Sequence, residues 1–271
     1  MPSFDTPGRV ALEISVPAGT VRIKTWDEPR VEVEVSPGRS DESSQQAAAE
    51  TRIEATERGG RHEVIVRAPK REGRFGFLGR SPELEVDVWC PEGTDLDLTT
   101  HSADLDVSGR MGDVDVRSAS GDAMLGDTGN LAYTTASGDL HAGTVGGTLT
   151  AKSASGDVSV REVGATASVT TVSGDVRLEE TDDVANVSSV SGDIDLGNAG
   201  RGARLNSVSG DVTIACRRGL ALWIDVQSVS GTVRSELDVD EAPPGEGDAV
   251  ELRVRTVSGD VRLSRAGAPV T

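Results

Sequence analysis

The chain has 271 residues, of which 3% are aromatic and 32 are glycine, and its formal net charge is −18. A chain of this length can bury a substantial core, but the scarcity of large rings favours thin layers of Val, Leu, Ile and Ala. The negative charge repels phosphate backbones and anionic lipid surfaces, which excludes a general nucleic-acid binder.

The N-terminus, MPSFDTPGRV, lacks the basic and apolar regions of a secretion signal, and no stretch approaches the roughly 18 apolar residues of a membrane helix. We therefore expect a cytoplasmic protein that does not insert into membranes. Cys90 and Cys216 have no CxxC or metal-ligand spacing, so both are expected to be buried small hydrophobes.

Residues 1–95 are predicted to form an N-terminal β-rich cap. Val, Ile or Leu occupies every second position of five runs, as in half-buried strands: Val10–Val16, Val21–Trp26, Val31–Val35, Glu63–Arg67 and Leu84–Trp89. A short helix is expected within Ser40–Glu57, capped by Ser40 or Asp41, although Arg52–Thr56 already reads as strand. The glycine-rich basic segment Lys70–Arg80 reads as a connector rather than a docking segment.

Residues 96–271 are organised by a recurring Ser-Gly-Asp triplet. Its central residues are 17 or 18 positions apart from Ala103, in a degenerate first copy, to Gly210, and the later steps are 21 and 28. A unit of about 18 residues is therefore stacking on itself. The acidic segment Asp238–Asp248, with Pro243-Pro244, lengthens the last step and is expected to be a solvated excursion.

Apolar residues fill fixed columns of the repeat. With the central glycine as zero, positions −5, +2 and +4 are mostly Val, Leu, Ile or Ala, so each repeat contains two strands joined by a corner at the triplet. Position −2 is also Val or Ala. This indicates that its side chain points inward too, so the set of inward positions shifts by one residue at the corner. The glycine is expected to supply a φ that residues with a Cβ resist. The pattern predicts an all-β fold, a parallel β-solenoid of about 18-residue coils stacked about 4.8 Å apart.

The aspartates of the triplet form one column: Asp122, Asp139, Asp157, Asp175, Asp193, Asp211 and Asp260. Carboxylates stacked about 5 Å apart repel by just under about 1 kcal/mol even in water, so another interaction must offset the repulsion. Ca²⁺ between coils is one candidate, but the ion takes six to eight oxygens and each coil offers one aspartate here. The ligand number favours the alternative, in which each carboxylate accepts N–H groups of its own turn.

Position −3 carries a hydroxyl in every repeat and shares the parity of the inward positions: Thr100, Ser118, Thr135, Ser153, Thr171, Ser189, Ser207, Ser228 and Thr256. A buried hydroxyl ladder that bonds coil to coil is expected. The histidines His62, His101 and His141 accompany no GxSxG or HExxH motif, so no catalytic residue or cofactor is assigned. The outward residues at −4 and −6 are small and polar, as on a solvated sheet face.

The motif Val-Ser-Gly-Asp-Val-x-Leu, preceded by Pro91-Glu92-Gly93-Thr94, resembles the bacterial "putative adhesin" or toast-rack family of unknown function. The resemblance extends from Val21–Trp26 to Arg262-Leu263. It implies a solenoid-like β fold and a place in surface adhesion or envelope-associated signalling assemblies, and it carries over no catalytic or binding residue.

These observations predict a non-enzymatic scaffold that mediates protein–protein interaction. Open end strands need a cap or a partner, so self-association through an end coil, at Val257–Leu263, is expected. The alternative is an adhesin-like module that binds glycans or depends on Ca²⁺. An enzyme is the weakest option, because glycan-cleaving β-helices need carboxylates clustered on an exposed sheet, whereas these lie at a corner.

Overall fold

The structure is a computed structural model that describes residues 1–69, 81–217, 221–237 and 249–265. The segments Lys70–Arg80 and Asp238–Asp248, predicted to be a connector and an excursion, lie outside the described residues. The chain divides into two compact units, Met1–Asp139 and Leu140–Thr271, and each is described by itself. The predicted boundary between residues 95 and 96 stays a prediction.

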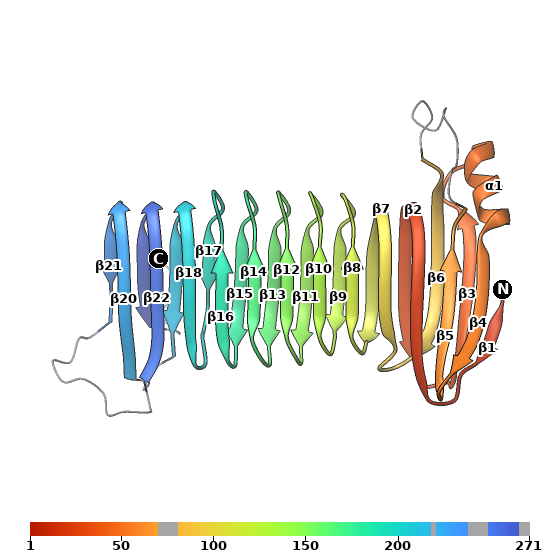
Figure 1. Cartoon of the computed structure of the whole chain (residues 1–271), viewed down its shortest axis with the longest axis horizontal. Coiled ribbons are helices and arrows are strands. Elements are labelled where there is room, and N and C mark those ends of the chain that lie inside the picture. The colour runs from red at the N-terminus through yellow and green to blue at the C-terminus, as the bar shows by residue number, and fades with distance from the viewer. Residues whose placement is uncertain (70–80, 218–220, 238–248, 266–271) are drawn as a thin grey trace. The chain divides into compact units, whose positions relative to one another are not determined.

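Unit 1 is built around a long strand that belongs to two sheets. Its elements are β1 (Ser3–Asp5), β2 (Arg9–Trp26), β3 (Arg30–Pro37), α1 (Glu42–Glu50), β4 (Arg52–Arg58), β5 (Arg61–Arg67), β6 (Glu83–Pro91), β7 (Asp95–Arg110), β8 (Val114–Arg117), β9 (Ala123–Asp127) and β10 (Leu131–Thr134). Both halves of β2 pair in parallel with β7, while the first half also pairs with β5 and the second with β6 (Figure 1). The expected runs Val10–Val16 and Val21–Trp26 are thus one strand.

The passage of β2 from one sheet to the other occurs near Gly19. This residue has φ +119°, and a Cβ on it would lie 2.6 Å from the backbone nitrogen of Leu84. Only glycine permits both this conformation and this approach. Antiparallel pairs β1–β3, β3–β6 and β4–β5 complete the unit, so the cap-like part of the chain is β-rich as expected.

The predicted short helix is confirmed as α1. Asp41 is its N-cap, and its carboxylate accepts the Ser44 N–H at 2.8 Å and the Ser43 hydroxyl at 2.7 Å. These hydrogen bonds, with the Arg39 guanidinium at 2.8 Å, hold the pKa of Asp41 well below its ordinary value. The segment after Thr51 is strand β4, as its sequence indicated.

Unit 2 consists of two parallel sheets wound from one repeat after another. Its strands are β11 (Leu140–Val145), β12 (Leu149–Lys152), β13 (Val158–Val163), β14 (Ala167–Thr170), β15 (Val176–Thr181), β16 (Val184–Ser188), β17 (Ile194–Leu196), β18 (Gly202–Ser209), β19 (Val212–Cys216), β20 (Ala221–Ser230), β21 (Val233–Ser235), β22 (Ala249–Ser258) and β23 (Val261–Arg265). Neighbours pair in register, as in the row Val158, Val176, Ile194 and Val212. The parallel β-solenoid predicted from the sequence is confirmed.

The last two repeats are exchanged in space. Strand β18 pairs with β22, and β22 pairs with β20, so the C-terminal repeat lies between two earlier ones (Figure 1). The same order, β19–β23–β21, holds in the other sheet. The prediction that Val257–Leu263 forms the end coil is wrong, because the repeat of β20 and β21 occupies that position.

The core follows the predicted columns. At position −5, Val169, Val187 and Leu205 are at most 1% exposed. Tyr133 fills the same column in unit 1, where its hydroxyl donates to the Asp139 carbonyl at 3.1 Å and burial raises its pKa to about 12. Both cysteines are free and buried, as expected, and burial raises the pKa of Cys90 to about 12.

Candidate interaction surfaces

The corner at the triplet uses its hydroxyl locally. At position −3, Ser153, Thr171 and Ser189 are buried, as predicted. Each accepts the N–H of the glycine three residues later, at distances between 2.7 and 3.0 Å. The expected coil-to-coil hydroxyl ladder is therefore wrong: a hydroxyl three residues upstream is already aimed at the turn of its own coil, the geometry of a local cap.

The aspartates, not the hydroxyls, connect the coils. In unit 2 the backbone N–H of Asp193 donates to Oδ1 of Asp175, and that of Asp211 donates to Oδ1 of Asp193, both at 2.8 Å. The ladder continues through Asp260 to the N–H of Thr232, also with 2.8 Å bonds. The prediction that each carboxylate binds N–H groups of its own turn is wrong. The bonds between coils nevertheless offset the repulsion between stacked carboxylates. A hydrogen bond to a charged group contributes about 1.5–3 kcal/mol, which is more than the expected repulsion.

The glycine of the triplet is required by close stacking. Gly174, Gly192 and Gly210 do not have positive φ, so the expected conformational reason is wrong for them. A Cβ on Gly192 would instead lie 2.6 Å from the carbonyl carbon of Gly174, and closer still to its oxygen. Successive corners therefore approach backbone to backbone, and any side chain would force them apart.

Position −2 forms an exposed ridge in unit 2. Its members, which we call the valine ridge, are Val172, Val190, Val208, Val257 and Val229 in spatial order, and they are between 44% and 82% exposed. The prediction that this column points inward is wrong. Simple alternation provided the signal, because in β18 Leu205 and Ser207 are buried while Asn206 and Val208 are exposed. One valine per coil thus makes a straight apolar row beside the aspartate ladder.

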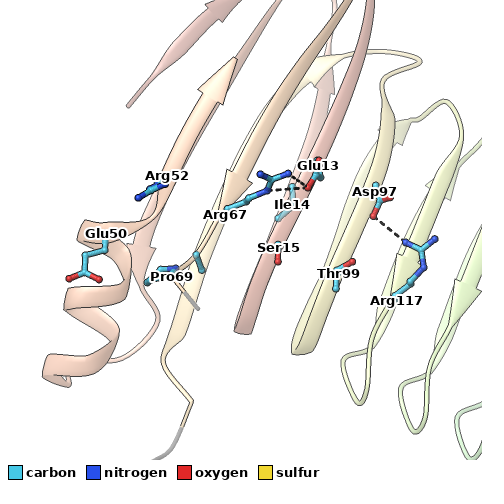
Figure 2. Close-up of a pocket in the computed structure, with 11 residues that line it drawn as sticks. Glu13, Ile14, Ser15, Glu50, Arg52, Arg67, Pro69, Asp97, Thr99 and Arg117 are labelled. Carbon is cyan, nitrogen blue, oxygen red and sulfur yellow. Dashed lines mark hydrogen bonds and ion pairs between the residues drawn. The ribbon is translucent and has the colours of Figure 1, made fainter. Parts of the chain in front are cut away.

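Unit 1 carries a polar groove on the outer face of one sheet (Figure 2). It encloses about 990 Å³ and is lined by Glu13, Ile14, Ser15, Glu50, Arg52, Arg67, Ala68, Pro69, Asp97, Thr99 and Arg117. Arg67 pairs with Glu13 at 2.6 Å and Arg117 with Asp97 at 3.4 Å. Three arginines thus face three carboxylates, and the groove has no net charge with which to attract an ion.

Two titratable groups in or near the groove have shifted pKa values. Burial raises the pKa of Asp115, and the neighbouring Asp97 adds to the effect while Arg117 opposes it. Glu13 raises the pKa of Arg67. The Glu13 carboxylate therefore favours the charged form of Arg67.

The described residues provide no group of three or more His, Cys, Asp or Glu side chains placed to hold a metal ion. The aspartates of the ladder are exposed at one per coil, and their Oδ1 atoms are occupied by N–H donors. That this column binds no Ca²⁺ stays a prediction. In the same described part, no helix has the length and apolar character needed to cross a bilayer.

Comparison with known proteins identifies the family. The model of the Toastrack DUF4097 family matches residues 10–264. The chain belongs to this family. The match spans both units of this toastrack protein and agrees with the resemblance of the triplet motif. No curated protein matches the sequence.

Solved structures similar to this toastrack chain include proteins of Parabacteroides distasonis and Bacteroides fragilis. A protein of Parabacteroides distasonis titled "putative lipid binding protein" is 16% identical, with a TM-score of 0.51 and coverage of 97% of this chain and 95% of that one. A "putative adhesin" of Bacteroides fragilis is 12% identical, with a TM-score of 0.40 and coverage of 97% and 95%. At such identities the first likeness shows the fold alone.

Proposed function

We propose that this toastrack protein is a non-enzymatic β-repeat scaffold that binds a partner protein along the valine ridge. The ridge itself carries the proposal. Single exposed apolar residues are ordinary on protein surfaces, but a contiguous exposed apolar row is typical of an interaction site. Val172, Val190 and Val208 are each close to half exposed on three successive coils.

The stack makes this row rigid. Ser191 N–H donates to the Val172 carbonyl and Ser209 N–H to the Val190 carbonyl, both at 2.8 Å, so the backbone of these two ridge valines is bonded to the next coil. Valine also has few rotamers to lose on binding. A partner with a narrow apolar groove, bordered by donors that face the aspartate column, matches this surface.

The non-enzymatic assignment rests on how the polar groups are used. The hydroxyls of Ser153, Thr171 and Ser189 cap their turns, ladder carboxylates join coils, and Asp41 caps a helix. The raised pKa values of Cys90 and Tyr133 come from burial, which keeps both groups protonated. We place the protein in the cytoplasm as part of the proposal, which its two free thiols support and cell fractionation tests.

A second candidate, an adhesin-like module that binds glycans or depends on Ca²⁺, is favoured only by the exposed aspartate column. Calorimetric titration of the whole chain with CaCl₂ separates the two. Micromolar binding at several sites supports the second candidate, and the absence of heat at those concentrations counts against its Ca²⁺-dependent form.

The experiment for the scaffold starts with a photo-crosslinking residue at Val190, expressed in the source cell, and with the same residue at Arg177 on the exposed sheet face of a neighbouring coil as control. The expected result is a discrete protein adduct at Val190 and none at Arg177. Binding of the purified partner to V172S/V190S/V208S should then weaken at least about tenfold, equivalent to about 1.4 kcal/mol. Equal labelling from both positions, or unchanged affinity of the triple variant, contradicts the proposal.

A further inference from the structure

The end coil of unit 2, formed by β20 and β21, has an open edge in each sheet. Strand β20 pairs with β22 on one side, and β21 pairs with β23. Within residues 140–217, 221–237 and 249–265, no strand pairs with the other edge of either. Alternate residues along the ten of β20 therefore present N–H and C=O groups to a further strand.

Apolar side chains that earlier coils bury are open in this coil. Val233 is 47% exposed, whereas its register partner Val261 is 1% exposed. Ile224 is 37% exposed, whereas its register partner Leu252 is 1% exposed. Leu222, two residues before Ile224 on the same face of β20, is partly exposed and adds to this surface. Removal of apolar surface from water is the main favourable contribution to protein association, so covering these side chains favours a partner at the end coil.

The edge also lacks the devices that keep sheet edges apart. Natural edge strands are short or carry lysine, proline or inward-pointing charges. Strand β20 has ten residues, contains no lysine or proline, and carries Asp225 as its one charged residue. Its length and composition therefore favour pairing of β20 with a further strand.

The charge of the end coil indicates which partner pairs with β20. Residues 221–235 contain one acid, Asp225, and one base, Arg234, so this coil is neutral in a chain of net charge −18. The adjoining strands β22 and β23 contain four arginines and one acid, Glu251, and Asp260 lies at the corner between them. Two copies of the chain that meet at this end avoid the repulsion that their acidic surfaces impose elsewhere.

The aspartate ladder determines the direction of the partner. Thr232 donates its N–H to Asp260, but it replaces the aspartate that would accept the next N–H. Another Ser-Gly-Asp coil stacked in the same direction would find no carboxylate there. An antiparallel neighbour needs none, and β20 opposite its own copy matches ten residues to ten.

We propose that two copies of this chain pair end to end through antiparallel β20 strands, in a two-fold symmetric dimer. The dimer goes beyond the partner binding proposed above, because it uses the end coil and leaves most of the valine ridge accessible.

Sedimentation over a wide concentration range and hydrogen exchange of residues 221–230 test the proposal on the full chain. The wild type should have the mass of two chains, with β20 protected from exchange. I224K/V233K places a charge on each exposed end position and should give a folded monomer with rapid exchange in β20. The matched control V190K alters an equally exposed valine on the ridge and should leave the dimer intact, while it weakens binding of the purified ridge partner.

A wild-type monomer overturns the proposal. If β20 is protected in that monomer, the chain covers its own end. A dimer that survives I224K/V233K overturns it as well, because the interface then lies elsewhere. Failure of the ridge crosslink with an intact dimer contradicts only the proposed function.

Discussion

Replacement of Gly192 by alanine tests the close stacking of the corners. The new Cβ would lie 2.6 Å from the carbonyl carbon of Gly174 and closer still to its oxygen. Ordinary contact begins at 3.4 Å, so the corner must move by at least about 0.8 Å. That displacement lengthens two hydrogen bonds, from Gly192 N–H to Ser189 Oγ and from Asp193 N–H to Asp175 Oδ1, both now 2.8 Å.

The expected loss follows from these bonds. One neutral and one charge-assisted hydrogen bond together contribute about 3 kcal/mol. Alanine restores about 0.4–1 kcal/mol by restricting the unfolded chain, so the net loss of local stability is about 2 kcal/mol. Because repeat proteins open locally, the appropriate measurement is native-state hydrogen exchange of residues 186–196.

Exchange in this segment of G192A should be roughly thirtyfold faster than in the wild type, the equivalent of about 2 kcal/mol. The matched control, S191A, changes the exposed neighbour and should alter stability by less than about 0.5 kcal/mol. Exchange in G192A as slow as in S191A would refute the argument that backbone contact between coils excludes a side chain.

Three further changes test the other bonds of the fold. D193A removes the acceptor of the Asp211 N–H and should cost about 1.5 kcal/mol in denaturant unfolding, whereas D193N keeps an oxygen acceptor and should lie closer to the wild type; equal losses would contradict the ladder. S189A removes the acceptor of the Gly192 N–H and should cost about 1 kcal/mol, and S189T should restore it. The lowered pKa of Asp41 means that α1 is stabilised above pH 3.8 and loses this stabilisation as the pH falls below it. Helix exchange measured against pH should show that loss in the wild type and not in D41N.

The columns and register of the stack could be predicted from the sequence for a simple physical reason. A strand alternates its faces every residue, and a coil of constant length returns each residue to the same place. Val158, Val176 and Ile194 are 18 residues apart and therefore stack. Asp41 could likewise be identified as a cap, because its bonds are local.

The bonds at the corner could not be predicted in the same way. A serine at −3 and an aspartate at +1 can each accept an N–H from their own turn or from the next, and only the distances decide. In the structure Ser189 binds within its coil and Asp193 between coils. The apolar character of Val190 predicts an inward side chain, whereas alternation from the buried Ser189 predicts the outward side chain that the structure has.

The exchanged order of the last coils could be predicted from two positions of the repeat, +1 and +4. Only an internal coil needs an aspartate to accept the next N–H and an apolar residue at +4 to cover the next layer. The repeat of β20 and β21 has Thr232 and Ser235 at those positions, as an end coil should. The C-terminal repeat retains Asp260 and Leu263, as an internal coil should.

Disulfide formation between strands tests the stacking order most directly. Arg204 and Arg253 are register partners on β18 and β22, and Arg253 separates Arg204 from Asp225 on β20. Neighbouring Cα atoms lie about 4.8 Å apart, within the range of a disulfide, whereas the next strand is about 9.6 Å away. Under mild oxidation R204C/R253C should crosslink and R204C/D225C should not, as mapped by peptide mass spectrometry. A bond in R204C/D225C without one in R204C/R253C would contradict the stack described here.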